Sequence, residues 1–70
     1  MDLRDNQITL GELWDDPRSR AVFQRRVPPL AAHPVKGAAR TVTLEQLADF
    51  LAGWVPRGMI NGVVEELRRL

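Results

Sequence analysis

The sequence predicts an all-α fold, a compact small bundle of four helices, two of them short, with a proline-rich irregular middle. Two similar segments, ITLGEL at 8–13 and VTLEQL at 42–47, each carry the signature of a helix start. The threonine of each segment is placed to cap a helix, and Glu12 or Gln46, three residues later, can reach back to the threonine's own N–H. Prolines and apolar residues at helical spacing mark two further helices.

The first helix is expected to begin at Leu10 and to be short, because Pro17 follows closely. The residue before a proline is disfavoured in the helical region, and the proline ring blocks a continuing helix. Asp16 can cap the next helix while Pro17 occupies its first position, where the missing N–H is no loss. The second helix is therefore predicted over 17–26, with Arg25 in a last turn that favours positive charge.

The segment after the second helix is the least regular part of the sequence. The pair Pro28 and Pro29 ends the helix, and residues 30–40 show no sustained period. His33 and Pro34 could open one short turn of helix. We interpret His33 as a cap or a half-buried contact, because a lone imidazole without a nearby carboxylate or cysteine set has no partners for chemistry.

The third helix is predicted over 44–52 and the fourth over 56–69, with Pro56 at its first position. The fourth has the clearest 3.6-residue period in the chain. Gly58 and Gly62 lie four residues apart on it, and each costs up to ~1 kcal/mol relative to alanine. They therefore predict a close approach of another backbone.

Residues 1–7 are polar and without a period, so we expect a flexible lead-in to a single helical domain of residues 8–70. The core of this domain should consist of the apolar residues that share the inward faces of the helices, together with both tryptophans, since so small a domain needs large apolar side chains. The predicted core is Leu10, Leu13, Trp14, Val22, Phe23, Val27, Leu30, Leu44, Leu47, Leu51, Trp54, Ile60, Val63, Val64 and Leu67.

Charge is segregated along the chain although the net charge is only +1. Residues 1–16 hold five acids against one arginine, a local charge of −4, and residues 17–44 hold six cations and no acid. Residues 45–70 hold four acids and three arginines, a local charge of −1. Two interpretations stay open: the cations form a solvated face that pairs with the acidic neighbours, or they contact an acidic partner.

The sequence does not contain the side chains that several classes of functional site require. The chain has no cysteine and one histidine, which removes disulfides, thiolate metal sites and cysteine nucleophiles. No constellation for catalysis, cofactor binding or metal binding is present, and adjacent carboxylates such as Asp15 and Asp16 are explained as caps. The polar start is unlike a signal peptide, so we expect a cytoplasmic protein or a module of a larger one. No membrane and no small-molecule substrate are expected.

Seven residues are candidates for binding a partner. Five of the six cations of the basic region would meet an acidic surface, and a tryptophan that proved exposed would be the best anchor for a protein. These candidates are Arg18, Arg25, Arg26, Lys36, Arg40, Trp14 and Trp54.

Two resemblances involve the caps, turns and core. The segment 9–13, with Pro17 and the segment 21–23, resembles the start of a small domain of unknown function related to the N-terminal domain of ScdA-like iron–sulfur cluster repair proteins. That family uses cysteine, and residues 27–32 here have none, so a cluster or thiol role does not carry over. The remainder resembles helical modules appended to some bacterial glycoside hydrolases and esterases, on Pro29–Leu30, His33–Pro34, Ala39–Arg40, Thr43–Leu44 and Gln46–Leu47. Both imply an accessory helical module without an active site.

A third resemblance points to another class of protein. Residues 43–51, a break, and residues 60–67 look like a helix-turn-helix, which implies that the fourth helix reads DNA. The connection 52–57 is longer than the usual turn, and Glu65 and Glu66 would face phosphate. We therefore expect a non-catalytic helical module for protein–protein interaction or self-association, with nucleic-acid binding through the Arg18 to Arg40 region and helix 56–69 as the alternative.

Overall fold

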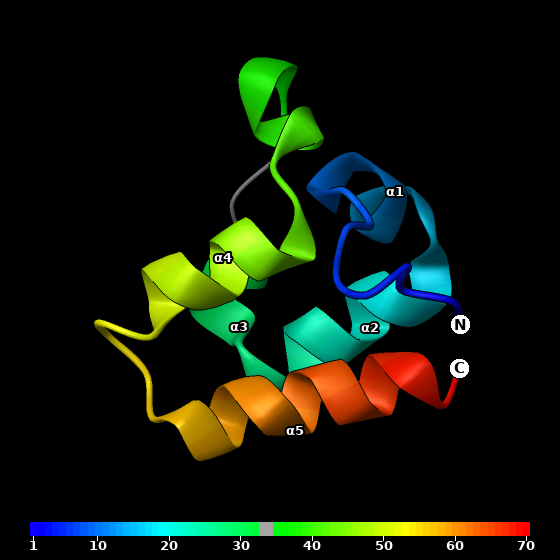
Figure 1. Cartoon of the computed structure of the whole chain (residues 1–70). Helices are drawn as coiled ribbons and strands as arrows, with labels where there is room; N and C mark the ends of the chain where they lie inside the picture. Colours follow the sequence, from blue (N-terminus) through cyan, green and yellow to red (C-terminus); the bar gives the residue numbers. More distant parts are fainter. Residues whose placement is uncertain (33–34) are drawn as a thin grey trace.

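Helices make up most of the part of the chain that the computed structural model describes, residues 1–32 and 35–70 (Figure 1). They are α1 (Leu10–Asp15), α2 (Pro17–Arg26), α3 (Pro28–Ala31), the 3₁₀ helix η1 (Gly37–Thr41), α4 (Leu44–Leu51) and α5 (Arg57–Arg68). α2 packs against α1, α3 and α5, and α1 packs against η1. Within those described ranges no strand is present, and the predicted all-α fold is confirmed.

Both predicted N-caps are present as complete capping boxes. At the start of α1 the Glu12 N–H donates to Thr9 Oγ1 at 3.3 Å, and the Thr9 N–H donates to the Glu12 carboxylate at 3.0 Å. At the start of α4 the Gln46 N–H donates to Thr43 Oγ1 at 3.1 Å, and the Thr43 N–H donates to Gln46 Oε1 at 3.0 Å. Each box satisfies two N–H groups that a helix start otherwise leaves without a partner.

The two boxes are also bonded to each other, which the sequence did not indicate. Thr9 and Thr43 form an isolated antiparallel bridge. The Leu10 N–H donates to the Val42 carbonyl and the Leu44 N–H donates to the Ile8 carbonyl, both at 2.8 Å. Each segment thus supplies the acceptor for the first helical N–H of the other. The similarity of ITLGEL and VTLEQL has a structural reason, because the two helix starts play equivalent parts in one contact.

Only one of the two boxes can titrate, and this predicts an acid sensitivity. The Thr9 N–H, donating to the Glu12 carboxylate, holds the pKa of Glu12 below its ordinary value, and the Thr9 hydroxyl and Arg4 act in the same direction. A carboxyl with a lowered pKa in the folded state adds stability that is complete above its unfolded pKa and is lost as the pH falls through the folded one.

We therefore expect Glu12→Gln to flatten the decrease of Tm below about pH 4.5, where carboxyls of ordinary pKa begin to protonate. Thermal melts of both proteins from pH 7 to pH 3 measure this effect. The amide preserves the bonded arrangement, as Gln46 does in the second box. The Asp16 carboxyl, whose pKa is lowered by Arg18, keeps part of the dependence in both proteins. Identical pH profiles would contradict the role given to Glu12.

The middle of the chain contains more helix than expected. α2 ends at Arg26 as predicted, but Pro28 then occupies the first position of α3, where its missing N–H costs no hydrogen bond. Further on, Gly37 begins η1 with a φ of +58°, a conformation that glycine adopts without steric cost. The expected opening of a turn at His33 and Pro34 lies outside the described residues.

Residues 1–7 differ from the flexible lead-in expected from their polarity. Leu3 is only 4% exposed, and the Met1 amino group donates to the Leu70 carbonyl at 2.7 Å, so the two chain ends lie side by side (Figure 1). The backbone of Arg4, Asp5 and Asn6 has positive φ at all three residues. This turn brings the Asn6 carbonyl to the Glu45 N–H at 2.9 Å, which binds the segment to α4.

Burial confirms most of the predicted core and corrects one residue. Nine of the predicted residues are buried: Leu10, Leu13, Trp14, Val22, Phe23, Leu44, Leu47, Val63 and Leu67. Five are half-buried: Val27, Leu30, Leu51, Ile60 and Val64. Trp54 is 77% exposed and does not belong to the core, while Leu3 and Ile8, which the prediction omitted, do.

The close backbone approach expected at two glycines occurs at a third. A Cβ on Gly58 would meet no atom within 4 Å, and one on Gly62 would meet the Arg26 guanidinium rather than a backbone. A Cβ on Gly11 would lie 3.1 Å from the Arg40 carbonyl oxygen. Gly11 therefore allows the chain at the end of η1 to pass directly over α1.

This difference predicts opposite effects of alanine at two helical glycines. Gly11→Ala should lower the free energy of unfolding by about 1 kcal/mol, because overpacking against backbone outweighs the gain in helix propensity. Gly58→Ala, placed in open space, should raise it by about 0.5–1 kcal/mol. Urea denaturation of the two variants measures both changes. A stabilised Gly11→Ala protein would show that η1 does not hold its position against α1.

Candidate interaction surface

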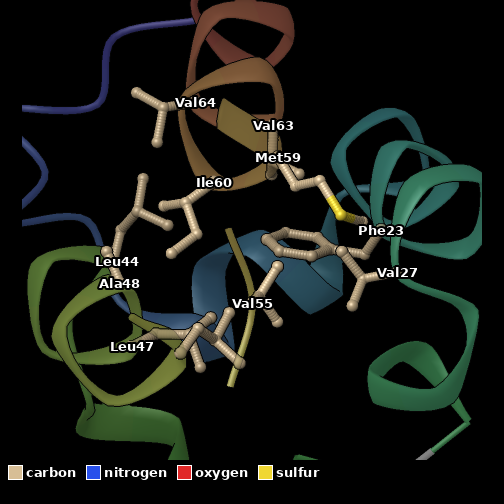
Figure 2. Close-up of a pocket in the computed structure, with 11 residues that line it drawn as sticks. Phe23, Val27, Leu44, Leu47, Ala48, Val55, Met59, Ile60, Val63 and Val64 are labelled. Carbon is tan, nitrogen blue, oxygen red and sulfur yellow. The ribbon is translucent and has the colours of Figure 1, made fainter. Parts of the chain in front are cut away.

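An apolar groove lies between α2, α4 and α5 (Figure 2). It is narrow: the space that a water-sized sphere can reach is only about 20 Å³. Every side chain that lines it is apolar: Phe23, Val27, Leu44, Leu47, Ala48, Leu51, Val55, Met59, Ile60, Val63 and Val64. Phe23 and Met59 lie next to each other on one side, with Leu47 and Ala48 on the other (Figure 2). The groove therefore offers apolar contact at its surface, and its inner wall belongs to the buried core.

Three large apolar side chains stand exposed at the end of the molecule where α4 leads into α5. Phe50 is 65% exposed, Trp54 77% and Met59 47%, and we call these three residues the exposed rim. The Phe50 and Trp54 rings are 6.1 Å apart at an interplanar angle of 31°. Met59 belongs to both the rim and the groove lining, so rim and groove are continuous.

The backbone fixes the position of Trp54 although its side chain is exposed. The N–H groups of Trp54 and Val55 both donate to the Leu51 carbonyl at 2.8 Å. This turn directs Val55 into the groove and leaves Trp54 in solvent. Pro56 then caps α5.

All four predicted partner-binding arginines are engaged in ion pairs within the chain, and three of them belong to α2. The Arg18 guanidinium lies 3.0 Å from the Asp16 carboxylate, next to the start of α2. Arg25 and Arg26, at the end of α2, both contact the Glu66 carboxylate on α5. Here the arginines form a solvated face paired with acidic neighbours, which is the first of the two interpretations left open by the sequence. Such exposed ion pairs contribute little stability.

The other three cations of the basic region 17–44 line a second part of the surface, which we call the cationic cleft. Arg20, Lys36 and Arg40 line it together with one carboxylate, Asp15. The Arg20 guanidinium donates to the Trp14 carbonyl at 3.0 Å, and Arg40 lies 2.5 Å from Asp15. Three cations and one acid leave a local surplus of two positive charges.

The two tryptophans, which sequence reasoning treated alike, have opposite environments. Trp14 is 7% exposed and its ring lies 4.7 Å from that of Phe23 in the core. It is therefore not available as a contact for a partner. Trp54 is the exposed one.

Phe50 and Met59 were missed as surface candidates. One signal in the sequence could have found Phe50: it lies four residues before Trp54 and off the apolar stripe of its helix. Met59 has no such signal, because it stands next to Ile60 in an apolar stretch, and the sequence does not show which of the two side chains is exposed.

Among the described residues no group of three or more histidine or acidic side chains is placed to hold a metal ion. No helix in the same ranges is long and apolar enough to cross a membrane. Comparison of the chain with models of protein families, with curated proteins and with solved structures found no match in any of the three. The fold and the surface define a small all-α protein with an exposed apolar patch.

Proposed function

We propose that this chain is a non-catalytic helical interaction module, an accessory part of a larger bacterial protein or complex, that binds a protein through the apolar groove and the exposed rim. The observation that carries this proposal is the exposure of Phe50, Trp54 and Met59 beside a groove lined only by apolar side chains. Two aromatic residues of about 150–250 Å² each, exposed by this much, leave roughly 210–360 Å² of apolar surface in water. The largest exposed apolar patch of a monomer is often functional, and here the two rings lie 6.1 Å apart in one patch.

The composition of the rim supports the same function. Tryptophan is enriched among residues that dominate binding energy, and aromatic residues and methionine are enriched at protein interfaces. Burial of the Trp54 side chain by a partner would release hydrophobic free energy. No entropy would be spent on ordering the Trp54 backbone, because hydrogen bonds to the Leu51 carbonyl already hold this turn.

The experiment compares the whole chain with the double variant Phe50→Ser, Trp54→Ser. We expect the wild-type chain to recover a protein partner from native lysate or to self-associate in light scattering, and the variant to do neither at equal concentration. Because both side chains are exposed, thermal melts should show that the variant remains folded. A wild-type chain that is strictly monomeric and recovers no partner, or a variant that behaves as the wild type, would contradict the proposal.

The cationic cleft favours one alternative, nucleic-acid binding. Its surplus of positive charge comes from Arg20, Lys36 and Arg40, whereas Arg25 and Arg26 share Glu66. Contact with phosphate through this cleft must weaken steeply as salt rises. Binding of a labelled duplex at low ionic strength that disappears with Lys36→Glu, but not with Arg25→Glu, would favour this alternative over protein binding. The absence of salt-sensitive binding would reject it.

A cytoplasmic location belongs to the proposal as well. It is supported by the sequence having no cysteine, so that this chain forms no disulfide and needs no oxidising compartment to fold. Fractionation of cells that express the tagged chain tests it.

A further inference from the structure

The cationic cleft is a second open feature of the surface, and it shares no lining residue with the apolar groove or the exposed rim. Its cations come from three segments: Arg20 from α2, Lys36 from the residues before η1, and Arg40 from η1 itself. A water-sized sphere reaches about 380 Å³ of space in the cleft, against about 20 Å³ in the groove. The cleft therefore has room for a small molecule, since pockets for such ligands measure about 300–1,000 Å³.

Contacts within the chain hold both arginines of the cleft in place. The Arg20 Nε and Nη2 groups donate to the Trp14 carbonyl at 3.0 and 2.5 Å, which leaves Nη1 without a partner among the described residues. Arg40 Nη2 donates to the Asp15 carboxylate at 2.5 Å, and Arg40 Cζ lies 3.2 Å from the position that a Cβ on Gly11 would take. The guanidinium thus occupies space that a larger residue than Gly11 would fill. Because both guanidinium groups are already held, less side-chain entropy is lost when their free N–H groups meet an anion.

The charge of the cleft is unbalanced. The Lys36 ammonium group forms no ion pair or hydrogen bond within residues 1–32 and 35–70. Asp15 is the one acid in the described lining. Glu12 and Asp16, the other acids of α1 and its C-terminal boundary, do not line the cleft, and each pairs with an arginine outside it. Three cations against one acid leave two positive charges that this part of the chain does not offset.

We infer that the cationic cleft binds the phosphate group of a small phosphomonoester. At pH 7 such a group carries a charge of about −1.5 to −2 and three strong acceptor oxygens, which match the surplus charge and the three cationic side chains. Guanidinium groups suit phosphate in particular, because their planar N–H groups bond its oxygens in pairs. The organic part of the ester contacts Ala31 and Val35, which supply apolar lining beside the cations.

A nucleic-acid backbone fits this distribution of charge less well. Each of its phosphates is a diester with a single negative charge, and binding along a strand requires cations that follow the strand beyond one cleft. Outside the cleft, the other three arginines of the basic region all pair with acids of the chain. The cleft is also separate from the exposed rim, so phosphate binding does not depend on the proposed protein partner.

NMR titration of the ¹⁵N-labelled chain tests the cleft with compounds of graded charge and size. The Nε–H signals of Arg20 and Arg40 report contact with the anion directly. We expect methyl phosphate and phenyl phosphate, both monoesters, to shift these signals, and phenyl phosphate to bind more tightly because its ring contacts Val35. Dimethyl phosphate, a diester with one negative charge, should bind at least about tenfold more weakly than methyl phosphate.

Three substitutions change the charge of the chain by one unit each. Lys36→Gln should weaken the binding of methyl phosphate about fivefold or more, because it removes a cation of the cleft. Arg25→Gln, the matched control, removes a cation that pairs with Glu66 outside the cleft, so the affinity should stay within about twofold. Asp15→Asn should tighten binding about two- to fivefold, since the surplus rises by one charge while the amide oxygen still accepts from Arg40. Circular dichroism verifies that each variant is folded.

The results separate three kinds of ligand. Equal binding of methyl phosphate and dimethyl phosphate would overturn the phosphomonoester in favour of a nucleic-acid backbone. Tighter binding of a short phosphoserine peptide than of phenyl phosphate would overturn the small molecule in favour of a phosphorylated protein. Signals of Arg20 and Arg40 that no compound shifts, or an affinity that Lys36→Gln leaves unchanged, would overturn the site itself and leave the protein-binding surface intact.

Discussion

Phe23→Ala should unfold most of this protein. Phe23 is 1% exposed, packs against Trp14 at 4.7 Å and forms one side of the apolar groove. Truncation of a buried phenylalanine costs about 3–5 kcal/mol, because the transfer free energy of the ring is lost and a cavity remains. The core of a domain of about 70 residues supplies only about 3–5 kcal/mol of net stability. Circular dichroism melts should show the cooperative transition lost or far below the wild-type Tm.

The matched control is the second phenylalanine. Phe50→Ala removes the same ring from a position that is 65% exposed, so the free energy of unfolding should change by less than about 0.5 kcal/mol. The same variant should weaken binding at the groove, since Phe50 belongs to the exposed rim. If Phe50→Ala also destabilised the chain by several kcal/mol, the rim would be part of the core and the proposed surface would be wrong.

The single variants Thr9→Ala and Thr43→Ala should each lose about 1 kcal/mol of stability, the usual contribution of one helix cap. The two threonines face each other in the antiparallel bridge, and the flanking N–H groups bond across it. Neighbouring residues in one hydrogen-bonded network couple. We therefore expect the loss in the double variant to differ from the sum of the single losses by about 0.5 kcal/mol or more.

A double-mutant cycle in urea measures this coupling, and Thr41→Ala is its control. The Thr41 hydroxyl donates only to the Ala38 carbonyl within η1, at an exposed position. Its removal should cost less than about 0.5 kcal/mol and add independently to either cap variant. Strict additivity of the two caps would show that the bridge is formed without energetic coupling. An unchanged Tm in Thr43→Ala would contradict the capping assignment itself.

The exposed rim has a cost for the free protein, because apolar surface left in water also favours non-specific association. The turn at Leu51 holds the backbone of this exposed segment, since the N–H groups of Trp54 and Val55 both donate to the Leu51 carbonyl. A contact surface that is already formed loses little entropy on binding. This arrangement is consistent with a module whose folded body positions one apolar surface.

By itself the sequence determined the places where helices begin and end. The two capping boxes, Asp16 followed by Pro17, and the break at Pro28 all operate within one helical turn, so their effect does not depend on distant contacts. The starts of α1, α2 and α4 therefore agree with the predicted ones to the residue. α3 was missed because the proline that ends one helix can also begin the next.

Tertiary structure decided which side chains are free to meet a partner. Trp14 and Trp54 each end a helical segment, yet only Trp14 has Phe23 across from it. Arg25 and Arg26 both pair with Glu66, about forty residues further along the chain, and no local pattern in the sequence indicates this contact. Exposure and ion pairing depend on residues that meet only after the helices pack, whereas a cap depends on its own turn. For that reason the sequence determined the helices, and only the packed chain shows the surface that they leave open.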